Sequence, residues 1–228
     1  MLICLPQVLT PAELQQVRVL LDTAGGAWVD GRVTAGHQGA AVKANQQIDE
    51  RSEVAHECQR IIATALERSP LFISAALPNK LYPPMFNRYS EGMGFGLHVD
   101  GGVRLHPYTG DKFRTDLSAT LFLTEPESYD GGVLQMEDTY GMHSAKLAAG
   151  DMVLYPSTSL HQVTPVTRGV RLASFMWVQS LVRDDADRAL LFDLDNAIQR
   201  LNLEGADEAA RRTLTGTYHN LLRKWSDT

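Results

Sequence analysis

A short segment of the chain places an imidazole and a carboxylate two positions apart. His98 and Asp100 stand in the extended run Gly96-Leu97-His98-Val99-Asp100. Side chains two residues apart in a strand project to the same face, so these two groups converge on one point. His161 follows the turn-like segment 155–160 and opens another expected strand. Together the three side chains could bind one divalent metal ion from one side.

This ligand set predicts an open metal centre. Two histidines and one carboxylate form the facial triad of non-haem Fe(II) oxygenases, which leaves three coordination positions vacant. A bidentate 2-oxo acid can fill two of them and dioxygen the third, whereas a structural zinc site is closed by four protein ligands. A His-x-Asp pair alone is a weak signal, because such pairs more often lie at loop ends. The addition of His161 and of an arginine ten positions later favours iron.

That arginine, Arg171, begins a run that reads as a strand. In such a strand Arg171, Ala173, Phe175 and Trp177 share one face, so an inward guanidinium requires an anion. The planar fork of arginine matches a carboxylate and stays charged, which suits the distal carboxylate of 2-oxoglutarate. A salt bridge to a surface carboxylate is the default alternative, and the spacing from His161 argues against it.

The composition is that of a folded protein without the charge that nucleic acid requires. The chain has 228 residues, of which 44% are hydrophobic and 21% are charged, and its formal charge is −6. These values argue against a disordered or coiled-coil chain, and we expect neither nucleic acid nor a membrane as a partner. Cys4 and Cys58 are the only cysteines, so we expect neither a disulfide framework nor a zinc knuckle. Without a recognisable secretory signal or membrane span, we expect a cytoplasmic protein.

The elements that must position these side chains are mainly β-strands. Residues 85–180 contain short apolar or alternating runs between Gly, Pro, Asp and Ser, which is typical of a sandwich or barrel. The expected strands lie near residues 85–89, 94–99, 117–123, 132–137, 143–147, 152–155, 161–166 and 170–180. Helical patterns occupy about 10–24, 49–68, 184–203 and 207–225. We therefore expect a helical and strand support at 1–80, a β core at 81–180 and a helical extension at 181–228.

Several motifs make the chain resemble a known enzyme family. They are Tyr89-x-x-Gly92-x-x-Phe95-x-x-His98-x-Asp100, Gly131-Gly132-Val133-Leu134, Gly150-Asp151, and His161 followed by Arg171. This order resembles the prolyl-4-hydroxylase-type 2-oxoglutarate and Fe(II)-dependent dioxygenases. The run Leu81-Tyr82-Pro83-Pro84-Met85-Phe86-Asn87-Arg88-Tyr89 and the C-terminal helices are more narrowly similar to the bacterial PKHD-type hydroxylases, also called the PiuC or YbiX group.

The resemblance implies a double-stranded β-helix, a jelly-roll or cupin-like core, with iron inside. It assigns Fe(II) to His98, Asp100 and His161, and the carboxylate of 2-oxoglutarate to Arg171. It implies an oxidoreductase that hydroxylates a substrate and releases succinate and CO2. It also implies L-ascorbate (vitamin C) as an accessory reductant and a link to iron uptake.

Two further residues are expected beside the co-substrate. Tyr89 corresponds to a hydroxyl-bearing position near the co-substrate in related enzymes. Strand parity places Thr120 on one face with Ser118 and Phe122, within reach of the co-substrate. Some relatives carry a tyrosine where this strand offers Phe122, so a second donor to the distal carboxylate must come from elsewhere.

The sequence leaves the substrate and two other classes of protein open. A prolyl or lysyl side chain, a free amino acid and a siderophore-related small molecule all fit the resemblance. One alternative class is a cupin-like metal-binding sensor or isomerase without oxygenase turnover, and another is a β-sandwich interaction module without metal. The long segment 101–116 could be a substrate lid, because long loops beside sites are often functional. Leucine-rich C-terminal helices permit a homodimer.

Overall fold

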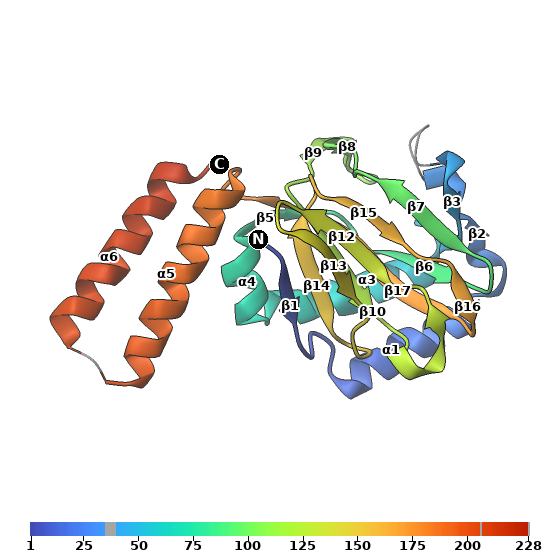
Figure 1. Cartoon of the computed structure of the whole chain (residues 1–228), viewed down its shortest axis with the longest axis horizontal. Helices are drawn as coiled ribbons and strands as arrows, with labels where there is room; N and C mark the ends of the chain where they lie inside the picture. The colour runs from blue at the N-terminus through green and yellow to red at the C-terminus, as the bar shows by residue number, and fades with distance from the viewer. Residues whose placement is uncertain (35–39, 206, 228) are drawn as a thin grey trace.

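Two antiparallel β-sheets face each other in the computed structural model, which describes residues 1–34, 40–205 and 207–227 (Figure 1). In spatial order the larger sheet contains β1 (Ile3–Leu5), β14 (Met152–Pro156), β10 (Leu117–Phe122), β17 (Arg171–Ser180), β6 (Met85–Tyr89), β4 (Gln46–Ile48) and β2 (Trp28–Asp30), with β5 (Pro78–Leu81) also paired to β17. The smaller sheet contains β13 (Gly141–Ala145), β12 (Leu134–Asp138), β15 (Leu160–Val163), β7 (Gly94–His98) and β3 (Lys43–Ala44).

Two short ribbons and the helices complete the fold. The ribbons pair β8 (Val103–Leu105) with β9 (Lys112–Arg114), and β11 (Asp130–Gly131) with β16 (Val166–Arg168). The α-helices are α1 (Pro11–Asp22), α3 (Glu53–Glu67), α4 (Pro70–Ala76), α5 (Asp185–Leu203) and α6 (Glu208–Trp225). Short 3₁₀ turns lie at Gly25–Ala27, Gly31–Thr34 and Pro126–Ser128. The predicted class, mainly β with flanking helices around a jelly-roll core, is confirmed.

Residues alternate between the two faces of the larger sheet, as the strand period requires. On β10, Leu117 and Leu121 belong to the core cluster that includes residues of α1, α3 and α4. The intervening Ser118 and Thr120 face the space between the sheets and line its cavity. One face of this sheet therefore stabilises the fold while the other carries polar side chains into the interior.

Local chemistry explains where several elements begin and end. Thr10 caps α1 through the expected capping box, since its hydroxyl accepts from Glu13 N at 3.3 Å and its own N–H donates to the Glu13 carboxylate at 2.9 Å. The helix expected from about residue 49 begins later, at Glu53, because Ser52 caps it by accepting from Ala55 N. The single strand expected over 161–166 is two strands, because Pro165 lacks an N–H for the ladder.

The segment 101–116 is an ordered ribbon that contains β8 and β9. Phe113 on β9 packs with Tyr82 and Trp177 in a small buried cluster. Val103 and Arg104 on β8 line the cavity between the sheets. The ribbon therefore forms part of the wall of this cavity.

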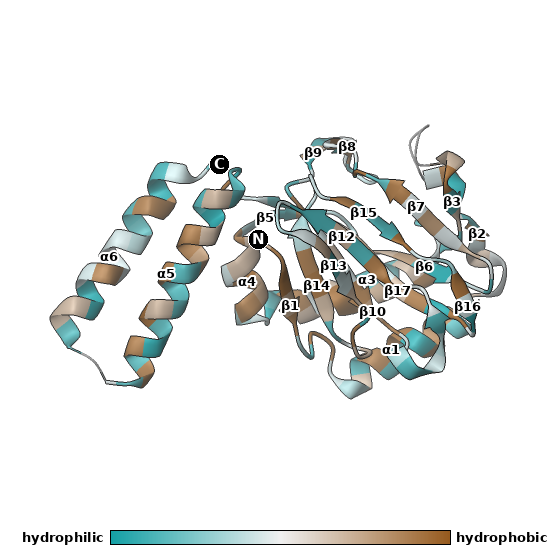
Figure 2. Ribbon diagram, viewed as in Figure 1, coloured by the Kyte–Doolittle hydropathy of each residue, from teal (hydrophilic) through white to brown (hydrophobic). Residues whose placement is uncertain are grey.

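Helices α5 and α6 form a hairpin that extends to one side of the sheets (Figure 1). Both helices alternate hydrophilic and hydrophobic positions (Figure 2). The hairpin joins the body through a cluster with buried Leu77, Val182 and Leu191. Ser74 on α4 also donates to Asp195 on α5 at 2.6 Å. None of the helices within the described ranges combines the length and apolar character that a bilayer crossing requires.

Candidate active site

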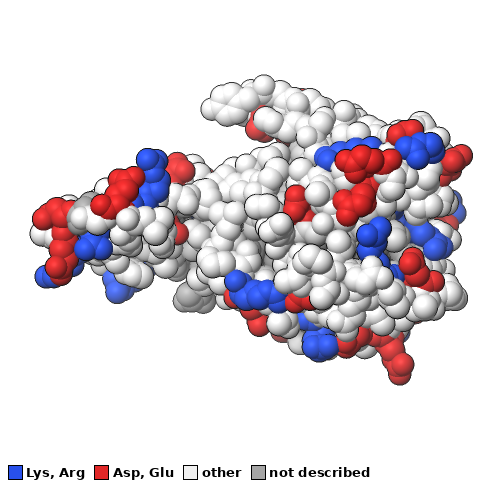
Figure 3. All heavy atoms as spheres, turned by 90° about the horizontal axis from the view of Figure 1, so that it is seen from below, with Lys and Arg blue, Asp and Glu red and all other residues white. Residues whose placement is uncertain are grey.

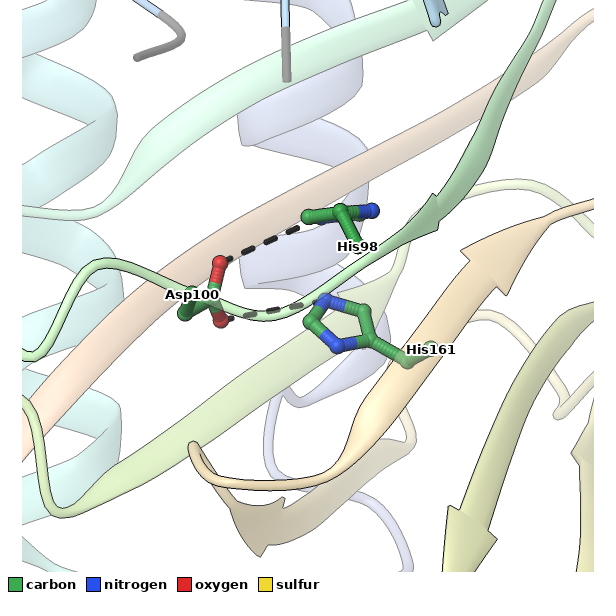
Figure 4. Close-up of side chains that lie close together, drawn as sticks. All are labelled: His98, Asp100 and His161. Carbon is green, nitrogen blue, oxygen red and sulfur yellow. Dashed lines mark ion pairs between the residues drawn. The ribbon is translucent and has the colours of Figure 1, made fainter. Parts of the chain in front are cut away.

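Three side chains predicted from the sequence meet in the structure. His98 lies at the end of β7, Asp100 just after it, and His161 on β15, and their side chains point toward one another (Figure 4). One nitrogen or oxygen atom from each lies within 4.8 Å of the others. The Asp100 carboxylate lies 4.0 Å from His98 Nε2 and 3.8 Å from His161 Nε2. Pairing of His98 with His161 across β7 and β15 brings the two rings together.

Backbone carbonyls orient both imidazoles. Nδ1 of His98 lies 2.8 Å from Gly96 O, and Nδ1 of His161 lies 3.0 Å from Ser159 O. A carbonyl can only accept, so each Nδ1 carries the proton and each Nε2 keeps its lone pair toward the shared point. This is the tautomer that metal-binding histidines adopt when their other nitrogen is hydrogen-bonded.

The surroundings keep His98 neutral and fix the carboxylate. Burial and the neighbouring His161 lower the pKa of His98 to about 4, and Phe95 stacks on its ring at 3.6 Å. Ser118 donates a hydrogen bond to Asp100 Oδ2 at 2.6 Å, and its hydroxyl also lies 2.8 Å from the Ser157 hydroxyl. Two imidazoles and one held carboxylate form a donor set suited to a divalent transition metal.

Arg171 is a buried cation that has no counter-charge among the described residues. It is 1% exposed, and none of its three guanidinium nitrogens has a hydrogen-bond partner among the described residues. Its guanidinium lies 5.4 Å from the Tyr89 ring and 5.3 Å from the Phe122 ring. A buried unpaired charge is costly, so the arrangement fits an anion that binds there.

A cavity of about 520 Å³ connects these features. It is lined by the three triad residues together with Tyr89 and Thr120. Its size lies within the range of small-molecule sites. Arg171 is not among the lining residues, although it is the register partner of Tyr89 across β17 and β6. The guanidinium therefore lies beside the cavity, next to Tyr89.

Sequence reasoning missed several residues at the site. Tyr155, on β14 opposite Ser118, lines the cavity, and burial raises its pKa well above the ordinary value. The available signal in the sequence was the alternation of side chains along the strand. The pairing of β14 with β10 then places Tyr155 opposite Ser118. Lys43 and Arg104 also line the cavity. Neither has a motif, because β3 is two residues long and β8 lies in a segment expected to be a loop.

The sequence matches an enzyme family along nearly its whole length. Residues 84–179 match the family model described as the 2OG-Fe(II) oxygenase superfamily, and residues 185–227 match the PKHD-type hydroxylase C-terminal domain. A PKHD-type hydroxylase of Cupriavidus metallidurans is 72% identical over 228 residues, which cover 100% of both chains. The chain therefore belongs to the PKHD-type hydroxylases, which are 2-oxoglutarate-dependent dioxygenases with iron as their metal.

Solved structures show the same fold at low sequence identity. A prolyl-4-hydroxylase of Pseudomonas putida superposes with a TM-score of 0.53 at 21% identity, covering 78% of this chain and 92% of that one. A prolyl hydroxylase of Trichoplax adhaerens, solved with a peptide fragment of hypoxia inducible factor, gives a TM-score of 0.55 at 16% identity and covers 83% of this chain and 86% of that one. These likenesses support the jelly-roll architecture.

Proposed function

We propose that the protein binds Fe(II) through His98, Asp100 and His161 and hydroxylates a C–H bond at the expense of 2-oxoglutarate. Succinate and CO2 are the co-products. The observation that carries the proposal is the convergence of the three side chains with both imidazoles held in the metal-binding tautomer. When bound, iron supplies the activation of dioxygen that no side chain can provide.

The chain's own residues bind, orient and shield. His98 and His161 present Nε2 lone pairs without giving up a proton, and Ser118 holds Asp100 in place. Arg171 binds the distal carboxylate of 2-oxoglutarate, which requires the cavity to extend past Tyr89 to the guanidinium. Residues around the triad, such as Phe95, exclude water from the reacting carbon.

Three hydroxyl groups complete the proposed co-substrate site. Tyr89 and Thr120 line the cavity and contact 2-oxoglutarate along its length. Tyr129 supplies the second donor that Phe122 cannot. Its hydroxyl is buried and has no hydrogen-bond partner among the described residues, and the adjacent Arg171 charge acts on its pKa against the upward effect of burial.

The finer features of the reaction rest on the family resemblance. The substrate is amino-acid-like, peptidyl or siderophore-related, the enzyme contributes to iron uptake, and L-ascorbate keeps the iron reduced. A metal-binding sensor without turnover shares the triad but would not release succinate. Succinate therefore separates the hydroxylase from this second candidate.

The test is a pair of measurements on wild type and two carboxylate variants. Anaerobic Fe(II) and 2-oxoglutarate should produce a weak visible charge-transfer band, and air should then release succinate. D100A should lose both signals while its circular dichroism stays unchanged. The control is D138A, which removes an exposed carboxylate 2.9 Å from His143 on the β12–β13 hairpin. Wild-type turnover in D100A would remove Asp100 from the ligand set.

A further inference from the structure

Two cations line the cavity, separate from Arg171. Lys43 on β3 and Arg104 on β8 both face this space. Lys43 is 6% exposed, and its Nζ lies 5.2 Å from the Phe95 ring centre and 5.9 Å from that of Phe175. Its Nζ donates to Thr34 Oγ1, a neutral acceptor, at 3.1 Å. This buried ammonium thus lies among aromatic rings and forms no ion pair with a carboxylate among the described residues.

Arg104 lies close to two aromatic rings. Its guanidinium lies 4.2 Å from the centre of the Trp177 ring and 5.2 Å from that of Tyr82. Its Nε is buried and has no hydrogen-bond partner in the described part of the chain. Burial and the neighbouring Arg104 charge lower the pKa of Lys43 to about 8. The two cations repel each other, and this repulsion persists until an anion binds between or beside them.

Two further residues that line this space, Trp177 and Gln47, carry buried neutral donors. The indole N–H of Trp177, a residue 5% exposed, has no partner among the described residues. Gln47 is fully buried, and its side-chain oxygen accepts a hydrogen bond from the Thr34 hydroxyl. Its amide nitrogen has no partner among the described residues. Unpaired buried donors are rare in folded proteins, because each loses its hydrogen bonds to water without replacement. Two such donors beside two cations indicate a site built for an acceptor.

Nearby carboxylates act on this cluster without forming an ion pair with Lys43 or Arg104 among the described residues. Asp30 pairs with Arg32, and Asp100 belongs to the triad. Glu50 acts electrostatically on Lys43 and Arg104 without forming an ion pair that the described residues record, and burial raises the pKa of its carboxyl. The positive charge of the cluster therefore remains available to a ligand.

Trp177, beside this cluster, and Arg171 lie far apart along β17. Trp177 and Arg171 are six residues apart on β17, which corresponds to about 20 Å of strand at about 3.3 Å per residue. Trp177 pairs with Ser118, the residue that holds Asp100, whereas Arg171 pairs with Tyr89. A 2-oxoglutarate molecule that reaches from the triad to Arg171 extends away from Trp177, so the second cluster is left for the other reactant.

We propose that Lys43 and Arg104, with the N–H groups of Trp177 and Gln47, bind a carboxylate of the substrate. The inference rests on the proposed function and narrows its substrate class to an anion with an apolar or planar part that packs against Phe95 and Phe175. A free acid and an acidic peptide side chain share this chemistry.

The test uses the protein loaded with Zn(II) and 2-oxoglutarate, which occupies the Arg171 end without turnover. Binding is read from the ¹⁵N-labelled indole N–H signal of Trp177, assigned with W177F. The probes are benzoate, phenylacetate and 3-phenylpropionate, each compared with its amide. We expect at least one acid to bind about tenfold or more tightly than its amide, as expected for a charge-assisted contact. Acetyl-Ala-Glu-Ala-amide against its Gln counterpart then shows whether a peptide can supply the carboxylate.

Matched variants decide the assignment. K43Q and R104Q should each weaken the acid about tenfold while 2-oxoglutarate affinity stays within about twofold, which also shows that the variants fold. The control K112Q removes an exposed lysine from the same ribbon and should change neither affinity. No preference for any acid, or a preference that survives both K43Q and R104Q, overturns the inference. If the wild type does not bind 2-oxoglutarate, the proposed function is overturned instead. The acids are then titrated against the metal-free protein, so that the inference is still tested.

Discussion

Arg171 shows how much one side chain reveals about the site. Its whole guanidinium is buried between two aromatic rings without a hydrogen-bond partner in the described structure. An unpaired charge in this position destabilises the unliganded protein, so an anion that binds it stabilises the fold. The sequence supported this assignment, because ten positions separate Arg171 from His161. The place of Arg171 beside the cavity, next to Tyr89, could not be predicted, since it depends on pairing between strands far apart in the chain.

Replacing Arg171 with lysine should separate co-substrate binding from metal binding. In R171K a point charge replaces a bidentate fork, so the KM for 2-oxoglutarate should rise about tenfold or more while iron content stays within about twofold. Succinate formation at varied 2-oxoglutarate measures the first, and metal analysis the second. The control is R168K, which changes an exposed arginine paired with Asp130. An unchanged KM in R171K would contradict the role of Arg171 as the anchor.

Ser118 should affect the metal without touching it. S118A removes the 2.6 Å hydrogen bond to Asp100 Oδ2, so Asp100 gains freedom to turn away from the two imidazoles. Loss of such a supporting contact typically weakens metal affinity about 10–100-fold. Anaerobic Fe(II) titration measures the affinity, with S128A as a surface serine control that loses a bond to Glu125 O. Equal affinity in S118A and wild type would show that Asp100 is held by other means.

At the scale of elements, the Gly131-Gly132 motif has a packing reason. Gly132 has a φ of +60°, and a Cβ there would lie 3.0 Å from Arg171 Cδ, Tyr129 Cε2 and Val166 Cγ2. The turn thus lets the backbone pass directly against the stem of Arg171. The glycines were recognised from the sequence as part of a family motif, but this contact was not.

Gly132→Ala should therefore disturb both stability and co-substrate binding. Positive φ and overpacking together should lower the free energy of unfolding by about 2–4 kcal/mol, and the displaced Arg171 should raise the KM for 2-oxoglutarate. Gly205→Ala is the matched control, because Gly205 has a φ of +66° and, among the described residues beyond its chain neighbours, no atom lies within 4 Å of the added Cβ. Chemical denaturation and succinate kinetics measure the two effects. A KM shift as small as that of Gly205→Ala would refute the packing role.

Strands of the β core were more predictable than those that precede it. The alternating pattern of β10 and the long run of β17 mark them clearly, and β6 matches its predicted range of 85–89. β1, β2, β3 and β4 have two or three residues each, too few to display a period. They are stabilised by pairing with distant strands, which the sequence does not show. Lys43 escaped prediction for this reason.

At the scale of the whole molecule, the C-terminal hairpin is anchored to the body through a small core. Leu191 is fully buried in the cluster with Leu77 and Val182, whereas the adjacent Leu190 is 57% exposed.

Charges on the face seen in Figure 3 are of mixed sign. We propose the division into 1–80, 81–180 and 181–228 as structural parts. The exposed positions of the hairpin permit the homodimer considered from the sequence.

Adjacent leucines test how tightly the hairpin is coupled to the sheets. L191A should lower the free energy of unfolding by about 3 kcal/mol, because it opens a cavity at the joint. L190A should change it by less than about 0.5 kcal/mol, as expected for an exposed position. Urea denaturation followed by tryptophan fluorescence measures both. Similar values for the two variants would mean that the hairpin does not contribute to the stability of the body.

The most direct measurement of the central claim is a crystal structure grown anaerobically with Fe(II) and 2-oxoglutarate. Anomalous scattering locates the iron without reference to any assumed ligand. We predict one iron bound by His98 Nε2, Asp100 and His161 Nε2, with the distal carboxylate of 2-oxoglutarate on Arg171. Iron bound elsewhere, or 2-oxoglutarate directed away from Arg171, would contradict the account.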